Sequence, residues 1–353
     1  MNTSRTSIIA VALSGGVDSA VAAALLQQQG HRLVGITMNL LPGAVATSAA
    51  EQVAEHLGIP LHRIDLTDAF EQQVITPFVT CYLNGETPNP CVRCNRLVKF
   101  GLLLDHAHQL GAARLATGHY ARVLQDADGR AHLHAAVDQR KDQSYFLAAI
   151  GQAALQQTLF PLGDMSGKDQ VRQLAHDFGL PVAAAKDSQD VCFLPDSGYA
   201  EFLEKRLTTP SPQGLIVHRS GQLLGRHNGF WRYTVGQRKG LGIAWSEPLY
   251  VLEINAARNR VVVGEQQYLY APGLLADQAV WFGQEPRTPF EAHCKIRYRH
   301  APVPCLVEPQ GGAGMQVLFH EPQRAVTPGQ TVVIYQGDEV LGAGRITGAE
   351  LPC

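Results

Sequence analysis

The chain has 353 residues, of which 45% are hydrophobic and 17% charged, with a formal net charge of −2. This length predicts two or three globular domains, and the charge gives no overall sign of nucleic-acid binding. No apolar run approaches the ~20 residues of a membrane helix, and Met1 to Thr6 lack a secretory pattern, so we expect a cytoplasmic protein with no membrane partner.

The first 200 residues alternate short apolar runs with helix-like segments, which is typical of a parallel sheet covered by helices. A buried strand is predicted at Ile8 to Leu13, a helix at Asp18 to Gln29 and a strand at Leu33 to Met38. The further predicted elements are a helix from Ser48 (with Glu51) to Gly58, a strand at His62 to Leu66, a helix at Asn95 to Leu110, a strand at Ala113 to Thr117 and a helix opened by Ser166 and Asp169. This order predicts a doubly wound α/β domain over residues 1–205.

Beyond residue 205 the sequence becomes rich in Gly, Pro and short alternating runs, which indicates two small β-rich domains. We place them at 206–272 and 273–353, with Ala271-Pro272-Gly273 as a linker. From Lys205 to Ser246 there is no Asp or Glu. Trp231 and Tyr233 lie among its basic residues, so this stretch suits contact with a nucleic-acid backbone. A solvated basic face is the less favoured alternative.

The turn between the first strand and the first helix has the sequence Ser14-Gly15-Gly16-Val17-Asp18-Ser19. Free backbone N–H groups and the dipole of a helix can hold a phosphate there, and glycine permits its close approach. The segment lacks the Lys-Ser/Thr pair of a Walker loop. It resembles the PP-loop of ATP pyrophosphatases, a resemblance that implies adenylation of a substrate with ATP and Mg2+.

Seven unevenly spaced cysteines do not suit a disulfide framework, so they indicate catalytic, metal-binding or inert thiols. Cys91 and Cys94 lie in Asn89-Pro90-Cys91-Val92-Arg93-Cys94-Asn95, directly before a predicted helix. The helix N-terminus and Arg93 are expected to lower a thiol pKa here. Half of a zinc site, a redox pair or two buried thiols remain alternatives.

A second cysteine segment, Lys186-Asp187-Ser188-Gln189-Asp190-Val191-Cys192-Phe193, is polar and rich in turn-forming residues. Taken by itself, this segment favours the interpretation of Cys192 as a buried structural thiol.

Together with further segments, these motifs identify the chain as similar to the bacterial tRNA-specific 2-thiouridylases, nearly from end to end. The further segments, in the family's order, are Thr117-Gly118-His119-Tyr120, Lys141 to Leu147, Phe160 to Gly163, Gly236 to Gly242, Arg297-Tyr298-Arg299 and Val326 to Gln330. The resemblance implies a Rossmann-like PP-loop domain followed by two small β domains, the last one barrel-like.

The resemblance also implies roles for individual residues. ATP would be bound by Ala12, Leu13, Ser14, Gly15, Gly16, Val17, Asp18, Ser19, Met38 and Gly118. Cys192 matches the cysteine that receives sulfur as a persulfide, and Cys94 matches the one that completes its release, leaving a disulfide. The persulfide would come from a sulfur-relay protein or a cysteine desulfurase.

The same family binds tRNA and modifies its wobble uridine, a base that must be flipped out to be reached. The matching positions for the target base are Asn89, Pro90 and Cys91. Those matching other tRNA contacts are His119, Lys141, Asp142, Gln143, Arg299, His300 and Gln330.

One position departs from the family, because many relatives carry aspartate where this chain has Cys91. Cys91, Cys94 and Cys192 could therefore hold three corners of a four-iron–four-sulfur cluster, with the fourth iron carrying sulfide. The sequence leaves the persulfide and cluster mechanisms open. Cys81, Cys294, Cys305 and Cys353 match no catalytic position and are interpreted as structural or incidental.

Two other functions remain open at this level. A different PP-loop enzyme, such as a tRNA lysidine synthetase or an amidotransferase-type ligase, would use the same adenylation with a nitrogen nucleophile. A non-enzymatic RNA-binding protein could hold nucleotide only for structure. Dependence on cysteine and tRNA-dependent release of pyrophosphate would separate these alternatives.

Overall fold

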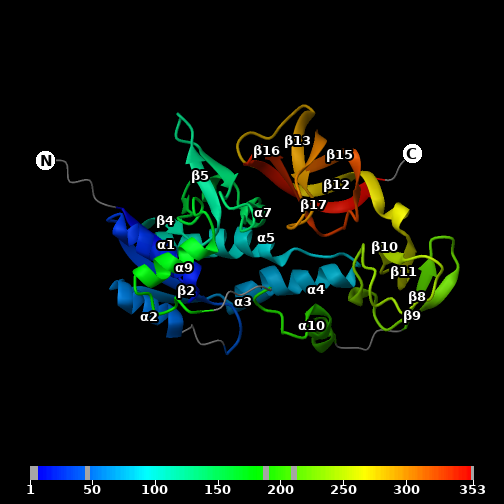
Figure 1. The fold of residues 1–353 in the computed structure, drawn as a ribbon, viewed down its shortest axis with the longest axis horizontal. Helices are drawn as coiled ribbons and strands as arrows, with labels where there is room; N and C mark the ends of the chain where they lie inside the picture. The colour runs from blue at the N-terminus through cyan, green and yellow to red at the C-terminus, as the bar shows by residue number, and fades with distance from the viewer. Residues whose placement is uncertain (1–6, 44–47, 186–190, 208–212, 351–353) are drawn as a thin grey trace.

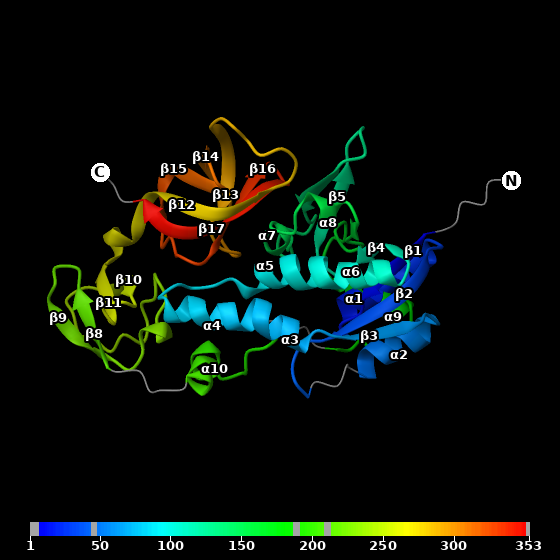
Figure 2. The ribbon, with the colours of Figure 1, turned by 180° about the vertical axis from the view of Figure 1, so that it is seen from behind.

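The computed structural model describes residues 7–43, 48–185, 191–207 and 213–350. The parallel sheet lies at one end of the molecule and the two β-rich parts lie at the other, with long helical segments between them (Figures 1 and 2). None of the described helices is long and apolar enough to cross a membrane.

The N-terminal sheet confirms the predicted doubly wound α/β fold. Its five described strands are all parallel and lie in the order β3-β2-β1-β4-β7. They are β1 (Ile8–Ala12), β2 (Arg32–Asn39), β3 (Leu61–Asp65), β4 (Ala112–Ala116) and β7 (Thr158–Leu159). The strand order reverses between β1 and β4, and in such sheets ligands bind at the carboxyl ends of the strands beside this reversal.

Helices cover both faces of this sheet. α1 (Val17–Gln28), α2 (Ser48–Leu57) and α9 (Lys168–Asp177) share one apolar core with β1, while α6 (Leu103–Gln109) lies in the core of the other face. Small side chains such as Ala20 and Ala23 let α1 approach the sheet closely. The helix predicted to open near Ser166 is present as α9, but its N-cap is Gly167, and the Ser166 hydroxyl donates to Gln170 Oε1 instead.

Two long, interrupted helical segments run from the sheet towards the β-rich end (Figure 2). The first consists of α3 (Thr67–Phe70), a π-helix (Glu71–Ile75) and α4 (Thr76–Leu83). The second consists of α5 (Pro90–Cys94), a π-helix (Asn95–Leu102) and α6, which confirms the predicted helix. Residues 84–89 join them, and we call this segment the strap. Shorter helices are α7 (Ser144–Leu147), α8 (Gln152–Leu155) and α10 (Tyr199–Arg206).

The central β-rich part is a sheet of four described strands in the order β10-β11-β8-β9. These are β8 (Gly214–His218), β9 (Leu223–His227), β10 (Leu249–Asn255) and β11 (Arg260–Glu265). Two 3-10 turns, Phe230–Arg232 and Gln266–Leu269, accompany them. Trp231 is only 4% exposed and packs in the core, so the expectation that it lies on a nucleic-acid surface is wrong.

The C-terminal part is a barrel in which pairing of β12 with β17 closes a ring of six described strands. They are β12 (Tyr270–Trp281), β13 (Phe290–Lys295), β14 (Val303–Gln310), β15 (Gly314–Arg324), β16 (Thr331–Gln336) and β17 (Glu339–Glu350). The predicted linker at Ala271 to Gly273 is wrong, because these residues belong to β12. Pro272 is accommodated where the register with β15 shifts between Ala271 and Gly273.

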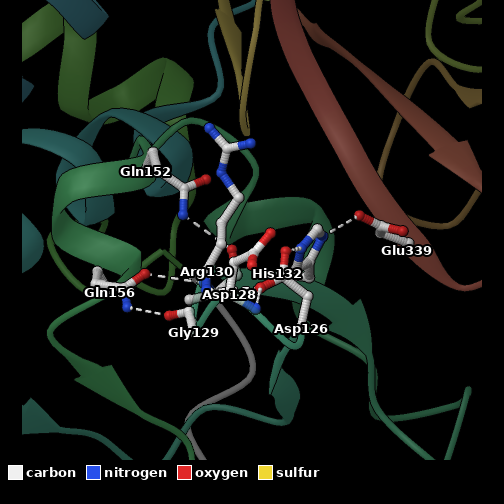
Figure 3. Close-up of polar contacts among 9 residues, drawn as sticks. Asp126, Asp128, Gly129, Arg130, His132, Gln152, Gln156 and Glu339 are labelled. Atoms are coloured by element: carbon white, nitrogen blue, oxygen red, sulfur yellow. Dashed lines mark hydrogen bonds and ion pairs between the residues drawn. The ribbon is translucent and has the colours of Figure 1, made fainter.

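A hairpin of the N-terminal part, β5 (Ala121–Gln125) with β6 (Ala131–Ala135), extends the barrel sheet by pairing with the start of β17. His132 of this hairpin lies between two carboxylates, with Nε2 3.1 Å from Asp126 and Nδ1 2.7 Å from Glu339 of β17 (Figure 3). These carboxylates raise the pKa of His132 and so favour its charged form at the junction between the two parts.

Candidate functional site: a phosphate loop and three thiols

The glycine-rich loop lies at the carboxyl end of β1, where the fold predicts a ligand. The Ser19 hydroxyl organises it: it donates to the Gly16 carbonyl at 3.0 Å and accepts from the Ser14 backbone N–H at 3.2 Å. Gly15 has a φ of 80°, which only glycine adopts without strain. Among the described side chains none caps the N-terminus of α1, so its dipole faces the space in front of the loop.

Gly118 lies against this loop, although one hundred residues separate them. A Cβ at position 118 would lie 2.6 Å from the Asp18 carbonyl carbon and 2.7 Å from the Ser19 nitrogen. Glycine is therefore required there by packing. Met38 lies near the carboxyl end of β2, at the same edge of the sheet as the loop, and is partly exposed.

Asp18 carries two contacts that the motif did not reveal. Its Oδ1 accepts from the Tyr120 hydroxyl at 2.7 Å and from Lys168 Nζ at 2.7 Å. Tyr120 follows β4 and Lys168 is the first residue of α9. The fold brings Tyr120 and Lys168 next to the loop, and no spacing in the sequence could have predicted their contacts with Asp18.

The three cysteines singled out from the sequence form one electrostatic group. Cys91 and Cys94 lie on α5, Cys94 buried and Cys91 partly exposed, while Cys192 is exposed. Cys192 contributes to the raised pKa of both Cys91 and Cys94. The positive charge of Lys99, from the π-helix that follows α5, acts in the opposite direction and partly offsets the raised pKa of all three thiols. The segment 186–190 that precedes Cys192 lies outside the described residues.

The expectation that α5 and Arg93 lower the thiol pKa is wrong. Burial dominates: it raises the pKa of Cys94 to about 11 and raises that of Cys91 as well. The pKa of Cys192 is also raised, because the surrounding protein displaces part of its solvent although its side chain is exposed. Arg93 bonds the Gln73 carbonyl instead, and Lys99 is the cation that counteracts burial. The structure describes six cysteines, and all six are free thiols.

The placement of the same three cysteines bears on the possibility of a metal cluster. In the described ranges no group of three or more His, Cys, Asp or Glu side chains is placed to hold a metal ion. Cys91, Cys94 and Cys192 therefore do not have the arrangement of cluster ligands in this structure.

The strap places the next predicted residues. Asn89 is the N-cap of α5 and its side chain accepts from the Val92 N–H at 3.3 Å; Pro90 begins the helix and is buried. Gln330, from the barrel, donates to the carbonyls of Thr87 and Pro88 at 2.9 and 3.2 Å. Gln330 is thus bonded to the strap that carries Asn89.

The remaining residues expected at tRNA differ in exposure. Asp142 is 4% exposed, and its carboxylate accepts from the backbone of Ala136 and Ser144. Gln143 accepts from the Tyr120 N–H, and burial lowers the pKa of His119 well below its usual range. Lys141 and His300 are partly exposed and Arg299 is exposed.

Family models for three consecutive segments match the chain. They are described as a tRNA methyl transferase HUP domain (residues 7–196), a tRNA methyl transferase PRC-barrel domain (200–265) and an aminomethyltransferase beta-barrel domain (271–346).

Whole relatives match as well. The tRNA-specific 2-thiouridylase MnmA of Pelobacter propionicus is 58% identical over 347 residues, covering 97% of this chain and 98% of the relative. The protein of the same name from Trichlorobacter lovleyi is 57% identical, with the same coverage. The chain therefore belongs to the family of tRNA-specific 2-thiouridylases.

Proposed function

We propose that the chain catalyses the ATP-dependent 2-thiolation of the wobble uridine of tRNA, with sulfur carried on Cys192 and released by Cys94. The observation that carries the proposal is the position of Lys99. Its charge acts on all three thiols and also on His119, the neighbour of the glycine packed against the phosphate loop. This shared charge supports a single site for adenylation and sulfur transfer.

The phosphate loop serves the first step. The uridine O2 attacks the α-phosphorus of ATP, the bond to the bridging oxygen breaks, and pyrophosphate leaves with the electron pair. The open N-terminus of α1 binds the phosphates. Mg2+, a hard cation that prefers oxygen ligands, would be held by the Asp18 carboxylate and would neutralise phosphate charge.

The different exposure of Cys192 and Cys94 supports different roles for the two thiols in the second step. Cys192 is exposed, so a persulfide-bearing donor protein can transfer its outer sulfur to it and leave as a thiol. The terminal sulfur of the Cys192 persulfide then attacks C2 and expels AMP. Buried Cys94 attacks the Cys192 sulfur, which breaks the S–S bond, frees the thiouridine and leaves a Cys94–Cys192 disulfide for an external thiol reductant.

Basic residues outside the catalytic part support tRNA as the substrate. A polar cavity of the central part is lined by Arg226, Arg232 and Gln237, and its neighbour is lined by Arg238. Arg226, Arg238 and Lys239 are exposed. Exposed cations grouped in this way suit the phosphate backbone of tRNA, and binding should weaken steeply with salt.

The test separates adenylation from sulfur transfer. In Cys192→Ser we expect tRNA-dependent pyrophosphate release to persist while 2-thiouridine falls below detection; Cys353→Ser is the matched thiol control. Full thiolation by Cys192→Ser would refute the role of this residue.

The mechanism with an iron–sulfur cluster has its own test. The protein is purified anaerobically, its iron and sulfide are measured, and thiolation is assayed with a persulfide donor. We expect iron-free protein to be active. Activity that depends on bound iron would overturn the persulfide mechanism, and activity with no dependence on sulfur would favour a PP-loop ligase that uses a nitrogen nucleophile.

A further inference from the structure

The phosphate loop contains no lysine of its own, but the fold brings one to it. Lys168 is separated from Asp18 by 150 residues in the sequence, and its Nζ lies 2.7 Å from Asp18 Oδ1. The side chain of Lys168 is only 12% exposed and that of Asp18 is 35% exposed. α1 and α9 pack together on the same face of the sheet (Figure 1), so Lys168 reaches the loop from the α9 side.

The negative charge of Asp18 is unfavourable for binding ATP at this position. A carboxylate in the first turn of α1 lies where the helix dipole attracts anions, and it repels the triphosphate that the loop has to bind. A nearby cation removes this repulsion. Lys168 is that cation in the free protein, and the Tyr120 hydroxyl holds the same carboxylate oxygen at 2.7 Å.

We propose that Lys168 binds the two leaving phosphates of ATP and stabilises the pyrophosphate that departs from the α-phosphorus. This inference rests on the adenylation step of the proposed function. When the bond between the α-phosphorus and the bridging oxygen breaks, negative charge develops on the pyrophosphate. The Lys168 ammonium neutralises that charge without transferring a proton.

The positions of the thiols and of α9 indicate which phosphates of ATP Lys168 would contact. The α-phosphorus must face the uridine and the thiols, and Cys94 belongs to an apolar cluster with Phe193 and Val98. α9 belongs instead to the apolar cluster that contains α1 and α2. With the α-phosphorus on the side of the thiols, the two leaving phosphates would point towards α9.

The test compares nucleotides with and without those phosphates. Binding of α,β-methylene ATP with Mg2+, and of AMP, is measured by calorimetry on the full-length protein without tRNA, for wild type, Lys168→Met and Lys168→Arg. Arg32→Met is the matched control, because Arg32 is an exposed cation at the amino end of β2, on the opposite edge of the sheet.

In Lys168→Met we expect affinity for the ATP analogue to fall by about 10- to 100-fold and affinity for AMP to stay within about threefold. Lys168→Arg should recover part of the loss, and Arg32→Met should bind both nucleotides as wild type does. Thermal unfolding, followed for each variant, shows that the comparison is made on folded protein.

Two results would overturn the proposal. If Lys168→Met lost affinity for the ATP analogue and for AMP equally, Lys168 would only shape the loop through Asp18. If affinity for the ATP analogue were unchanged, Lys168 would not reach the phosphates. Because these measurements need no tRNA, they fail or succeed independently of thiolation, which is assayed separately on the wild type.

Discussion

The phosphate loop and the thiol site are built in opposite ways. The loop is one run of residues, Ala12 to Ser19, whose own hydroxyls and glycines fix its shape. The thiol site joins α5, the segment of Cys192 and the strap, and the strap is held by both β-rich parts. A change at the loop should therefore act locally, whereas the thiol site should respond to changes in a different part of the protein.

The contacts of the strap show how strongly the thiol site depends on the barrel. Thr87 N–H donates to the Pro328 carbonyl at 2.8 Å, and Glu86 accepts from Arg345 of β17 at 2.9 Å. Arg345 also pairs with Asp277 of β12. Gly85 packs on the Ile254 carbonyl of the central part, where a Cβ would lie at 2.8 Å. If tRNA docks on the β-rich parts, as proposed, its binding would act on the residues just before Cys91.

The largest effect is expected from Gly118→Ala, at the glycine that packs against the loop. The new Cβ would lie within 3 Å of the backbone of Asp18 and Ser19, so α1 or β4 must shift and ATP binding should become undetectable, at a cost of about 1–3 kcal/mol in stability. Calorimetry and thermal unfolding measure both. Gly225→Ala is the control, because a Cβ added at position 225 has nothing within 4 Å. Normal ATP affinity in Gly118→Ala would contradict the packing role of Gly118.

A barrel variant should produce the opposite pattern. Gln330→Ala removes both bonds to the strap carbonyls, so kcat for thiolation should fall by about tenfold while ATP affinity stays unchanged. Gln310→Ala, at an exposed amide of the same barrel, serves as the control. If Gln330→Ala weakened ATP binding as much as thiolation, the separation of the two regions would be wrong.

The titration of Cys94 sharpens the comparison further. Because its pKa is raised to about 11, its thiolate fraction and its rate of alkylation should increase about tenfold per unit between pH 7 and pH 10. Lys99→Met removes the cation that lowers this pKa, so alkylation at pH 9 should slow by about two- to tenfold. Arg96→Met is the control, and mass spectrometry of the Cys94 peptide gives the rate. A plateau below pH 9 would contradict the prediction.

The smallest effect is expected at the hairpin that joins the barrel. The pKa of His132 is raised above its ordinary value near 6.5, so its stabilisation is complete below that value and is lost as the pH rises through the higher, folded pKa. Between pH 6 and pH 8 the wild type should lose about 0.5 kcal/mol more stability than His132→Gln, measured by urea unfolding. An equal loss in both proteins would refute the charged imidazole.

The sequence by itself determined the parallel sheet and the phosphate loop. Apolar runs of strand length, helical periodicity and a Gly-Gly turn are local patterns, and the backbone that they favour is the backbone observed. The change in composition after residue 205 indicated the order of the domains, and family resemblance added the predicted tRNA positions.

Only the tertiary structure decided the environment of these residues. Lys168 beside Asp18, Arg345 beside Glu86 and the hairpin within the barrel sheet each join segments more than 100 residues apart. The thiol pKa values follow the same logic. Arg93 is next to Cys94 in sequence but points to Gln73, whereas Lys99 and the surrounding apolar core set the charge of the thiol. Burial and charge depend on what packs around a side chain, and no local pattern specifies that.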